Sequence, residues 1–136
     1  MKRIIASGAV AMFFLATIMS GSAGAHVFTA NTSLSIHKAP TGATAPGANV
    51  NVFGKLQSPR AMCAVDQLVK LFKVIDGPDK LLAKDRTDGE GTYGFVRQPS
   101  KDFKVYTKFP GSLETSYGHS HECQPSKSSK LLLDVK

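Results

Sequence analysis

Cysteine is scarce in this sequence, with two residues in a chain of 136. This number excludes a disulfide-dense miniprotein and a zinc site built from four cysteines. Glycine and proline occur 12 and 7 times without a fixed period, which excludes a collagen-like chain. The hydrophobic residues make up 42% of the chain, which is ordinary for a globular protein. The length corresponds to one domain.

The motifs of common catalytic and ion-binding sites are also missing. The chain has no G-x-S-x-G nucleophile elbow, no Cys-x-x-Cys redox pair and no EF-hand spacing. Five acidic residues raise the alternative of a calcium site or a carboxylate pair: Asp76, Asp79, Asp85, Asp88 and Glu90. Four of them fall in expected turns, where acidic residues are ordinary. The sequence therefore offers no catalytic residue, and we expect a protein that is not an enzyme.

The chain opens with the three parts of a secretory signal peptide, which we assign to residues 1–25. A short positive start is followed by an uncharged apolar run and then by small residues. We predict cleavage after Ala25, so that the mature chain begins at His26. Cleavage after Ala23 is one alternative, and an uncleaved membrane anchor is another. After cleavage we expect no membrane span and an extracytoplasmic location, in the cell envelope, the periplasm or the medium.

The mature part, residues 26–136, is expected to form one domain. Cleavage removes Lys2 and Arg3 and lowers the formal charge of +7 by two. The remaining charge permits attraction to an anionic polymer or lipid surface without requiring it. Cys63 and Cys123 are both exported, and an even pair in an oxidising compartment predicts one structural disulfide.

Short runs rich in Val, Leu, Phe and Tyr alternate with turn residues at a spacing typical of a β-sandwich. The sequence predicts seven strands, which cover residues 34–38, 49–56, 67–75, 80–86, 92–96, 103–109 and 131–135. Residues 61–72 have the alternative of a helical turn or two, and residues 110–124 are expected to form a polar loop. The expected fold class is therefore all-β, a single Ig-like sandwich of about seven antiparallel strands with one disulfide. The core is expected to contain Tyr93, Phe95, Phe103 and Val105.

Residues 87–95 fit the pattern T-D-x-x-G-x-Y-x-F, which is a hairpin signature. This segment resembles the prealbumin-like (transthyretin-like, carboxypeptidase-regulatory-like) β-sandwich domains. The cysteines strengthen the resemblance, because one precedes the V-x-L strand at residues 69–71 and the other precedes the last strand. The chain departs from the pattern at Gln67, where members often carry a basic residue. The resemblance covers residues 50–136 and implies a small secreted bacterial domain that acts as an adhesive, spacer or accessory module.

The strand expected at residues 103–109 has a basic face. Its apolar residues alternate with Lys104, Tyr106 and Lys108, which point the other way. Two cations beside an aromatic ring are suited to phosphates or an acidic glycan. The plainer interpretation is a solvated strand face whose lysines discourage edge pairing. We treat the three residues as a candidate ligand surface for another extracellular protein or an anionic cell-surface polymer, with no specific nucleic acid expected.

The histidines suggest a second hypothesis, a copper site at the new amino terminus. A terminal His26 chelates Cu(II) through its amine and its imidazole, and His119 or His121 is able to supply a further ligand. Cleavage after Ala23 instead leaves His26 third from the amine, an arrangement that also binds Cu(II). The plainer interpretation is one chance histidine and two solvated ones. The sequence thus predicts a secreted, non-enzymatic binding or structural module without a cofactor, and an exported copper-binding protein is the alternative.

Overall fold

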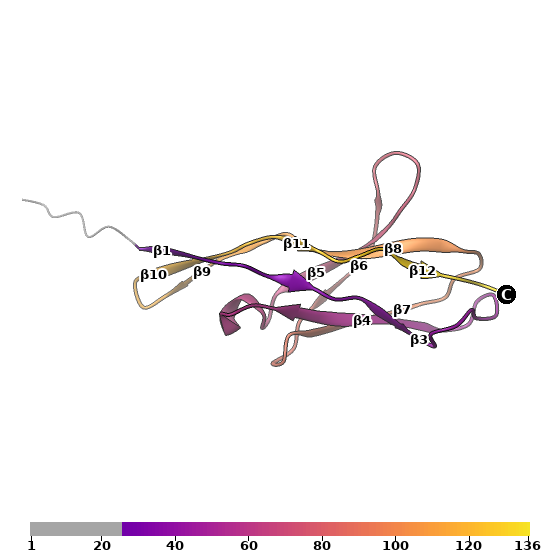
Figure 1. Cartoon of the computed structure of the whole chain (residues 1–136), viewed down its shortest axis with the longest axis horizontal. Helices are drawn as coiled ribbons and strands as arrows, with labels where there is room; N and C mark the ends of the chain where they lie inside the picture. Colours follow the sequence, from indigo (N-terminus) through magenta and orange to yellow (C-terminus); the bar gives the residue numbers. More distant parts are fainter. Residues whose placement is uncertain (1–25) are drawn as a thin grey trace, which may run out of the picture.

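The computed structural model describes residues 26–136, and the expected signal peptide lies outside the described residues. All the regular elements in this range are β-strands, apart from a single 3₁₀ turn, η1 (Ala61–Cys63). The fold is thus all-β, as expected. Figure 1 shows two layers of strands in the body of the molecule, with a smaller sheet extending from one end.

One layer has the strand order β11-β8-β5-β6, and β12 pairs with the other part of β8. Its strands are β5 (Leu68–Lys73), β6 (Lys80–Arg86), β8 (Phe103–Phe109), β11 (Ser126–Lys127) and β12 (Leu131–Leu133). The second layer consists of β2 (Ser33–Leu34), β3 (His37–Ala39), β4 (Val50–Gln57) and β7 (Thr92–Arg97). Both β2 and β3 pair with one side of β4, and β7 pairs with the other. All these pairs are antiparallel, as expected for a sandwich.

The main core lies between these two layers. Strand β4 alternates strictly between buried and exposed residues, as a strand with one face on a core must. A cluster of apolar side chains fills the space: Ile36, Val50, Val52, Val69, Leu71, Tyr93, Phe95, Val105 and Leu133. The expected burial of Tyr93, Phe95 and Val105 is confirmed, whereas Phe103 is only partly buried at the margin of this cluster.

Each fixed residue of the hairpin signature in residues 87–95 has a structural role. The Asp88 carboxylate accepts hydrogen bonds from the Glu90 and Thr92 amides, both at 2.9 Å, and these bonds lower the pKa of Asp88. Gly91 has a φ of +81°, in the left-handed region that favours glycine. Turn geometry therefore explains the aspartate and the glycine of the signature.

Tyr93 joins the two layers through its hydroxyl group. The hydroxyl donates to the Ser35 carbonyl oxygen in one layer and lies 2.8 Å from Thr107 Oγ1 in the other. Gly54 on β4 leaves room for this contact, because a Cβ there would collide with both the Ser35 oxygen and the Tyr93 hydroxyl. Burial raises the pKa of Tyr93 from 10.0 to about 12.

The predicted disulfide between Cys63 and Cys123 is present, with 5.4 Å between the two Cα atoms. Both cysteines are buried in a second small cluster with Ala30, Leu56 and Phe109. The bond connects η1, just before β5, to the end of β10. By chain-entropy reasoning, a closed loop of about 60 residues contributes about 4 kcal/mol.

The prediction of a polar loop over residues 110–124 is wrong. The segment forms a hairpin of β9 (Ser112–Ser116) and β10 (His119–Cys123), and β10 also pairs in parallel with β1 (Val27–Ala30). This sheet lies apart from the main core at one end of the molecule (Figure 1). Strands β9 and β10 are mostly polar because they have little core to cover, and sequence periodicity therefore gave no signal for them.

Two smaller expectations also need correction. The first strand, expected at residues 34–38, is divided into β2 and β3, because Ser35 turns its carbonyl oxygen toward Tyr93. The helical alternative for residues 61–72 is limited to the three residues of η1, and β5 begins at Leu68. With β1, β9, β10 and β11 added, the described chain contains more strands than the seven predicted.

We expect Tyr93→Phe to lower the free energy of unfolding by about 1–3 kcal/mol, because the buried Ser35 and Thr107 groups lose their partner. The difference in free energy of unfolding between the wild type and Tyr93→Phe should shrink as pH rises from 10 to 12. In that range the unfolded wild-type tyrosine loses its proton while the folded one keeps it, so wild-type stability falls with pH.

Urea denaturation of both proteins at pH 7, 10 and 11.5 measures this difference. Tyr117→Phe is the matched control, since that side chain is fully exposed. A Tyr93→Phe protein that equals the wild type at pH 7 would contradict the bridging role of the hydroxyl.

Candidate functional site

A row of four lysines crosses the outer face of the β6-β5-β8-β11 sheet. Lys70 on β5 lies directly opposite Lys84 on β6 and Lys108 on β8, and Lys108 lies opposite Lys127 on β11. Directly opposed residues of antiparallel strands project from the same face, and neighbouring strands are about 4.8 Å apart. We call Lys84, Lys70, Lys108 and Lys127 the lysine row.

The lysine row lacks direct acidic partners in the part of the chain that the structure describes. Within residues 26–136, ion pairs join Lys38 to Asp134 and Arg86 to Asp66, and no member of the row takes part in one. Like charges placed directly opposite each other destabilise a sheet. We therefore expect the row to lower the stability of the free protein, and a bound anion to offset that loss.

An aromatic pair lies beside the lysine row on the same face. Phe72 and Tyr106 are cross-strand partners, and their rings stack with centroids 5.4 Å apart. Lys127 Nζ lies 3.9 Å from the centroid of the Tyr106 ring, within the range of a cation–π contact. The Tyr106 hydroxyl donates to Asp79 Oδ2 at 2.8 Å, and burial together with this carboxylate raises the pKa of Tyr106.

The candidate ligand surface of Lys104, Tyr106 and Lys108 thus needs one correction. All three residues lie on the outer face, and both lysines are exposed as expected. Tyr106 is buried, with 6% of its surface exposed, because Phe72 and Lys127 cover its ring. Lysines from neighbouring strands, and not Tyr106, therefore extend this surface across the sheet.

The three histidines of the copper hypothesis meet at the small sheet. The rings of His26, His119 and His121 lie 6.5, 5.9 and 5.5 Å from the Phe28 ring, measured between centroids. Parallel pairing of β1 with β10 produces this arrangement, since Phe28 is the partner of His121. In the same register His26 lies beside His119, and the Ser120 amide donates to the His26 carbonyl oxygen at 3.5 Å.

The three rings surround Phe28, so they do not form a ready-made cluster. Among the residues that the structure describes, no group of three or more His, Cys, Asp or Glu side chains is placed to hold a metal ion. His121 Nδ1 is buried and has no hydrogen-bond partner in this part of the chain. A copper site here would need the amino group of His26 as one ligand.

Three of the acidic residues considered for a calcium or catalytic site accept hydrogen bonds from other groups of the protein. Asp88 holds its turn, Asp79 accepts from Tyr106, and Asp85 accepts from the Gly94 amide at 2.8 Å. Each of these bonds uses the carboxylate to satisfy a nearby donor, as in ordinary turns and strand edges.

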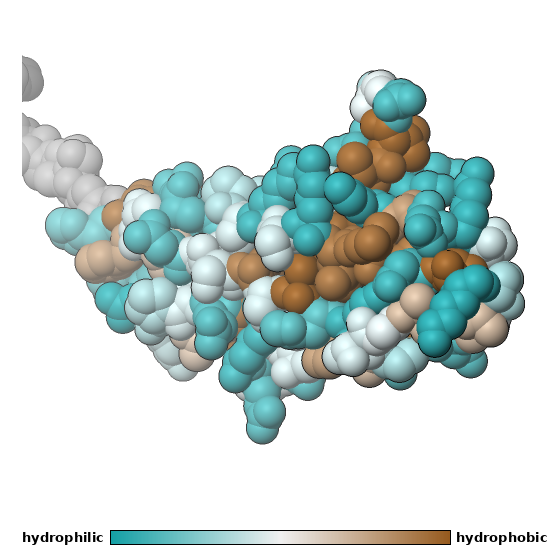
Figure 2. All heavy atoms as spheres, turned by 45° about the vertical axis from the view of Figure 1, so that its right-hand side comes forward, coloured by the Kyte–Doolittle hydropathy of each residue, from teal (hydrophilic) through white to brown (hydrophobic). Residues whose placement is uncertain are grey.

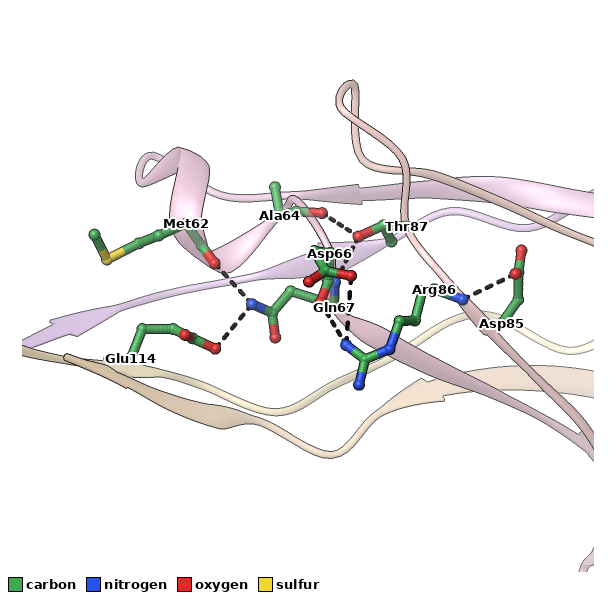
Figure 3. Close-up of polar contacts among 8 residues, drawn as sticks. All are labelled: Met62, Ala64, Asp66, Gln67, Asp85, Arg86, Thr87 and Glu114. Atoms are coloured by element: carbon green, nitrogen blue, oxygen red, sulfur yellow. Dashed lines mark hydrogen bonds and ion pairs between the residues drawn. The ribbon is translucent and has the colours of Figure 1, made fainter. Parts of the chain in front are cut away.

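Gln67 is a residue whose importance the sequence did not reveal. Its side chain is buried and its Nε2 donates to the Met62 carbonyl oxygen at 2.7 Å and to Glu114 Oε1 at 3.0 Å (Figure 3). It thereby joins the turn η1 to β9 of the small sheet. Thr87, the first residue of the hairpin signature, supports the same turn by donating to the Ala64 carbonyl oxygen at 2.6 Å.

Apolar side chains also reach the surface of the molecule. Figure 2 shows an apolar patch bordered by hydrophilic side chains, and further apolar atoms in the projecting loop between β5 and β6. Ile75 and Leu81, in and next to this loop, are about 40% exposed. In the part of the chain that the structure describes, no helix is long and apolar enough to cross a membrane.

Comparison of the sequence with models of known protein families and with curated proteins found no match.

We expect Lys70→Gln to raise the free energy of unfolding by about 0.2–1 kcal/mol, because Lys70 lies between two opposed lysines. Thermal unfolding in 20 mM salt measures the effect, and Lys101→Gln, on an exposed loop, is the matched control. The gain should shrink in 500 mM salt, where screening weakens the repulsion. A loss of stability in low salt would contradict the cost assigned to the lysine row.

Proposed function

We propose that this protein is an exported, non-enzymatic binding module that holds an anionic polymer of the cell surface against the lysine row. The lysine row carries the proposal, because four cations share one face and none of them forms an ion pair within residues 26–136. An anionic chain laid across the strands would meet one ammonium group at each strand. The polymer would then supply counter-charges in direct contact with the row.

The proposal also includes an extracytoplasmic location for the protein and a relationship to prealbumin-like domains. Export is supported by the disulfide, which forms and persists in oxidising compartments, and by the sequence of residues 1–25. A prealbumin-like relationship is supported by the T-D-x-x-G-x-Y-x-F segment within a two-layered all-β fold. Accessory and adhesive roles are common for such modules, and they agree with a flat charged face better than with a catalytic cleft.

Binding of defined polyanions tests this function. Polygalacturonate and inorganic polyphosphate, titrated calorimetrically at several salt concentrations, separate carboxylate from phosphate recognition. For a linear polyanion each contact contributes about 0.7 to the slope of log affinity against log salt, so four contacts predict a slope of about −3. The double variant Lys70→Gln/Lys108→Gln should bind at least tenfold more weakly, with the slope near −1.5.

The matched control is Lys101→Gln/Lys136→Gln, which removes the same charge from exposed positions outside the row. It should retain most of the affinity. Equal losses in the two double variants would mean that net charge alone drives binding, and the proposed site would then be wrong.

Copper binding is the second candidate function, and the gathering of three histidine rings around Phe28 favours it. We propose that, after cleavage before His26, its amine and imidazole bind Cu(II) with the imidazole of His119. Imidazole is a good copper ligand, and Cu(II) binds more tightly than the other divalent first-row metals at such sites.

Calorimetric titration of protein beginning at His26 with Cu(II) tests this proposal. We expect a dissociation constant of micromolar or tighter, weakened at least tenfold in His26→Ala and in His119→Ala. His37→Ala is the matched control, since His37 lies on β3 against Phe53, outside the small sheet. Affinity weaker than micromolar, or unchanged in His26→Ala, would remove the copper hypothesis.

A further inference from the structure

A second basic region lies between the two layers, at the base of the projecting β5–β6 loop. It is a cleft of about 400 Å³, lined among others by Lys73, Lys80, Arg97, Gln98, Leu82 and Phe103. Lys73 ends β5 and Lys80 begins β6, while Arg97 ends β7 and Phe103 begins β8. The cleft is thus formed where four strands from both layers end or begin.

Among residues 26–136, the cleft is lined by three cations and by no acidic side chain. None of the three forms an ion pair in the described part of the chain. Two acidic residues on nearby segments accept bonds from other groups: Asp79 accepts from Tyr106, and Asp102 accepts from the Val135 amide at 2.7 Å. The cations of the cleft are therefore free of direct acidic contacts within residues 26–136.

Two of the cations are held in place by the walls of the cleft. Arg97 Nη1 donates to the Leu82 carbonyl oxygen at 3.4 Å, and the rest of its guanidinium donors remain for other partners. Lys73 Nζ lies 4.5 Å from the centroid of the Phe103 ring. Leu82 and Phe103 are packed against the main core and supply apolar surface beside these charges.

We propose that this cleft binds a small organic anion with two negative charges beside a flat apolar part. The volume lies within the range of small-molecule sites, and such sites combine apolar walls with a few charged groups. Arg97 and Lys73 contact the acidic oxygens, and Phe103 contacts the apolar part. The site is separate from the lysine row, because the two lie on opposite faces of the strand. Lys73 is two residues after the buried Leu71 and therefore faces inward, whereas Lys70 faces outward.

The test is an NMR titration of the ¹⁵N-labelled protein, residues 26–136, with phthalate, phenyl phosphate, benzamide and inorganic phosphate. Phthalate and phenyl phosphate distinguish carboxylate from phosphate as the preferred acidic group. Binding of either at about 1 mM or tighter, with the largest shifts at the Arg97, Gln98 and Phe103 amides, supports the site. Equal shifts with neutral benzamide, or affinity for inorganic phosphate equal to that for both organic anions, would overturn it.

The variant Lys73→Gln/Arg97→Gln should weaken binding of the preferred anion at least tenfold, and exposed Lys80→Gln, which cannot disturb the core, should weaken it severalfold. The matched control is Lys70→Gln/Lys108→Gln, which removes the same charge from the outer face of the β6-β5-β8-β11 sheet, away from the cleft. It should leave this binding unchanged while it weakens polymer binding. Equal weakening by both double variants would overturn the cleft proposal, whatever the outcome for the polymer.

Discussion

The contact of the Tyr93 hydroxyl with Ser35 and Thr107 fixes how the two layers of this protein face each other. A buried hydroxyl must find partners, and these come from both sheets, so the spacing and the register of the layers are set together. The contact needs a glycine at position 54, and it accounts for the break between β2 and β3. Much of the remaining core is apolar packing, which is less directional and tolerates more variation.

Once the layers are fixed, the two faces of the β6-β5-β8-β11 sheet have opposite characters. The inner face buries Val69, Leu71, Val105 and Thr107, while the outer face carries the lysine row and the Phe72–Tyr106 stack. Because side chains alternate along a strand, the register that buries the core also aligns the lysines. Charge repulsion in the row is thus a consequence of a pairing that the core enforces.

The small sheet depends on a different constraint. It buries few apolar side chains, and the disulfide and the Gln67 hydrogen bonds attach β9 and β10 to the body of the protein. Such attachment lets polar strands remain paired without a core of their own. It also holds β10, which bears His119 and His121, beside β1, which directly follows His26.

The sequence by itself determined the all-β class, the disulfide, most strands of the sandwich and the turn at Asp88, because alternation, cysteine pairing and turn chemistry are local or compositional signals. Only the tertiary structure decided the lysine row, the burial of Tyr106, the gathering of the histidines around Phe28 and the basic cleft. Each of these depends on which strands become neighbours and in what register. Lys70, Lys84, Lys108 and Lys127 lie on four separate strands, and the pairing that aligns them is set by long-range packing that local patterns do not encode.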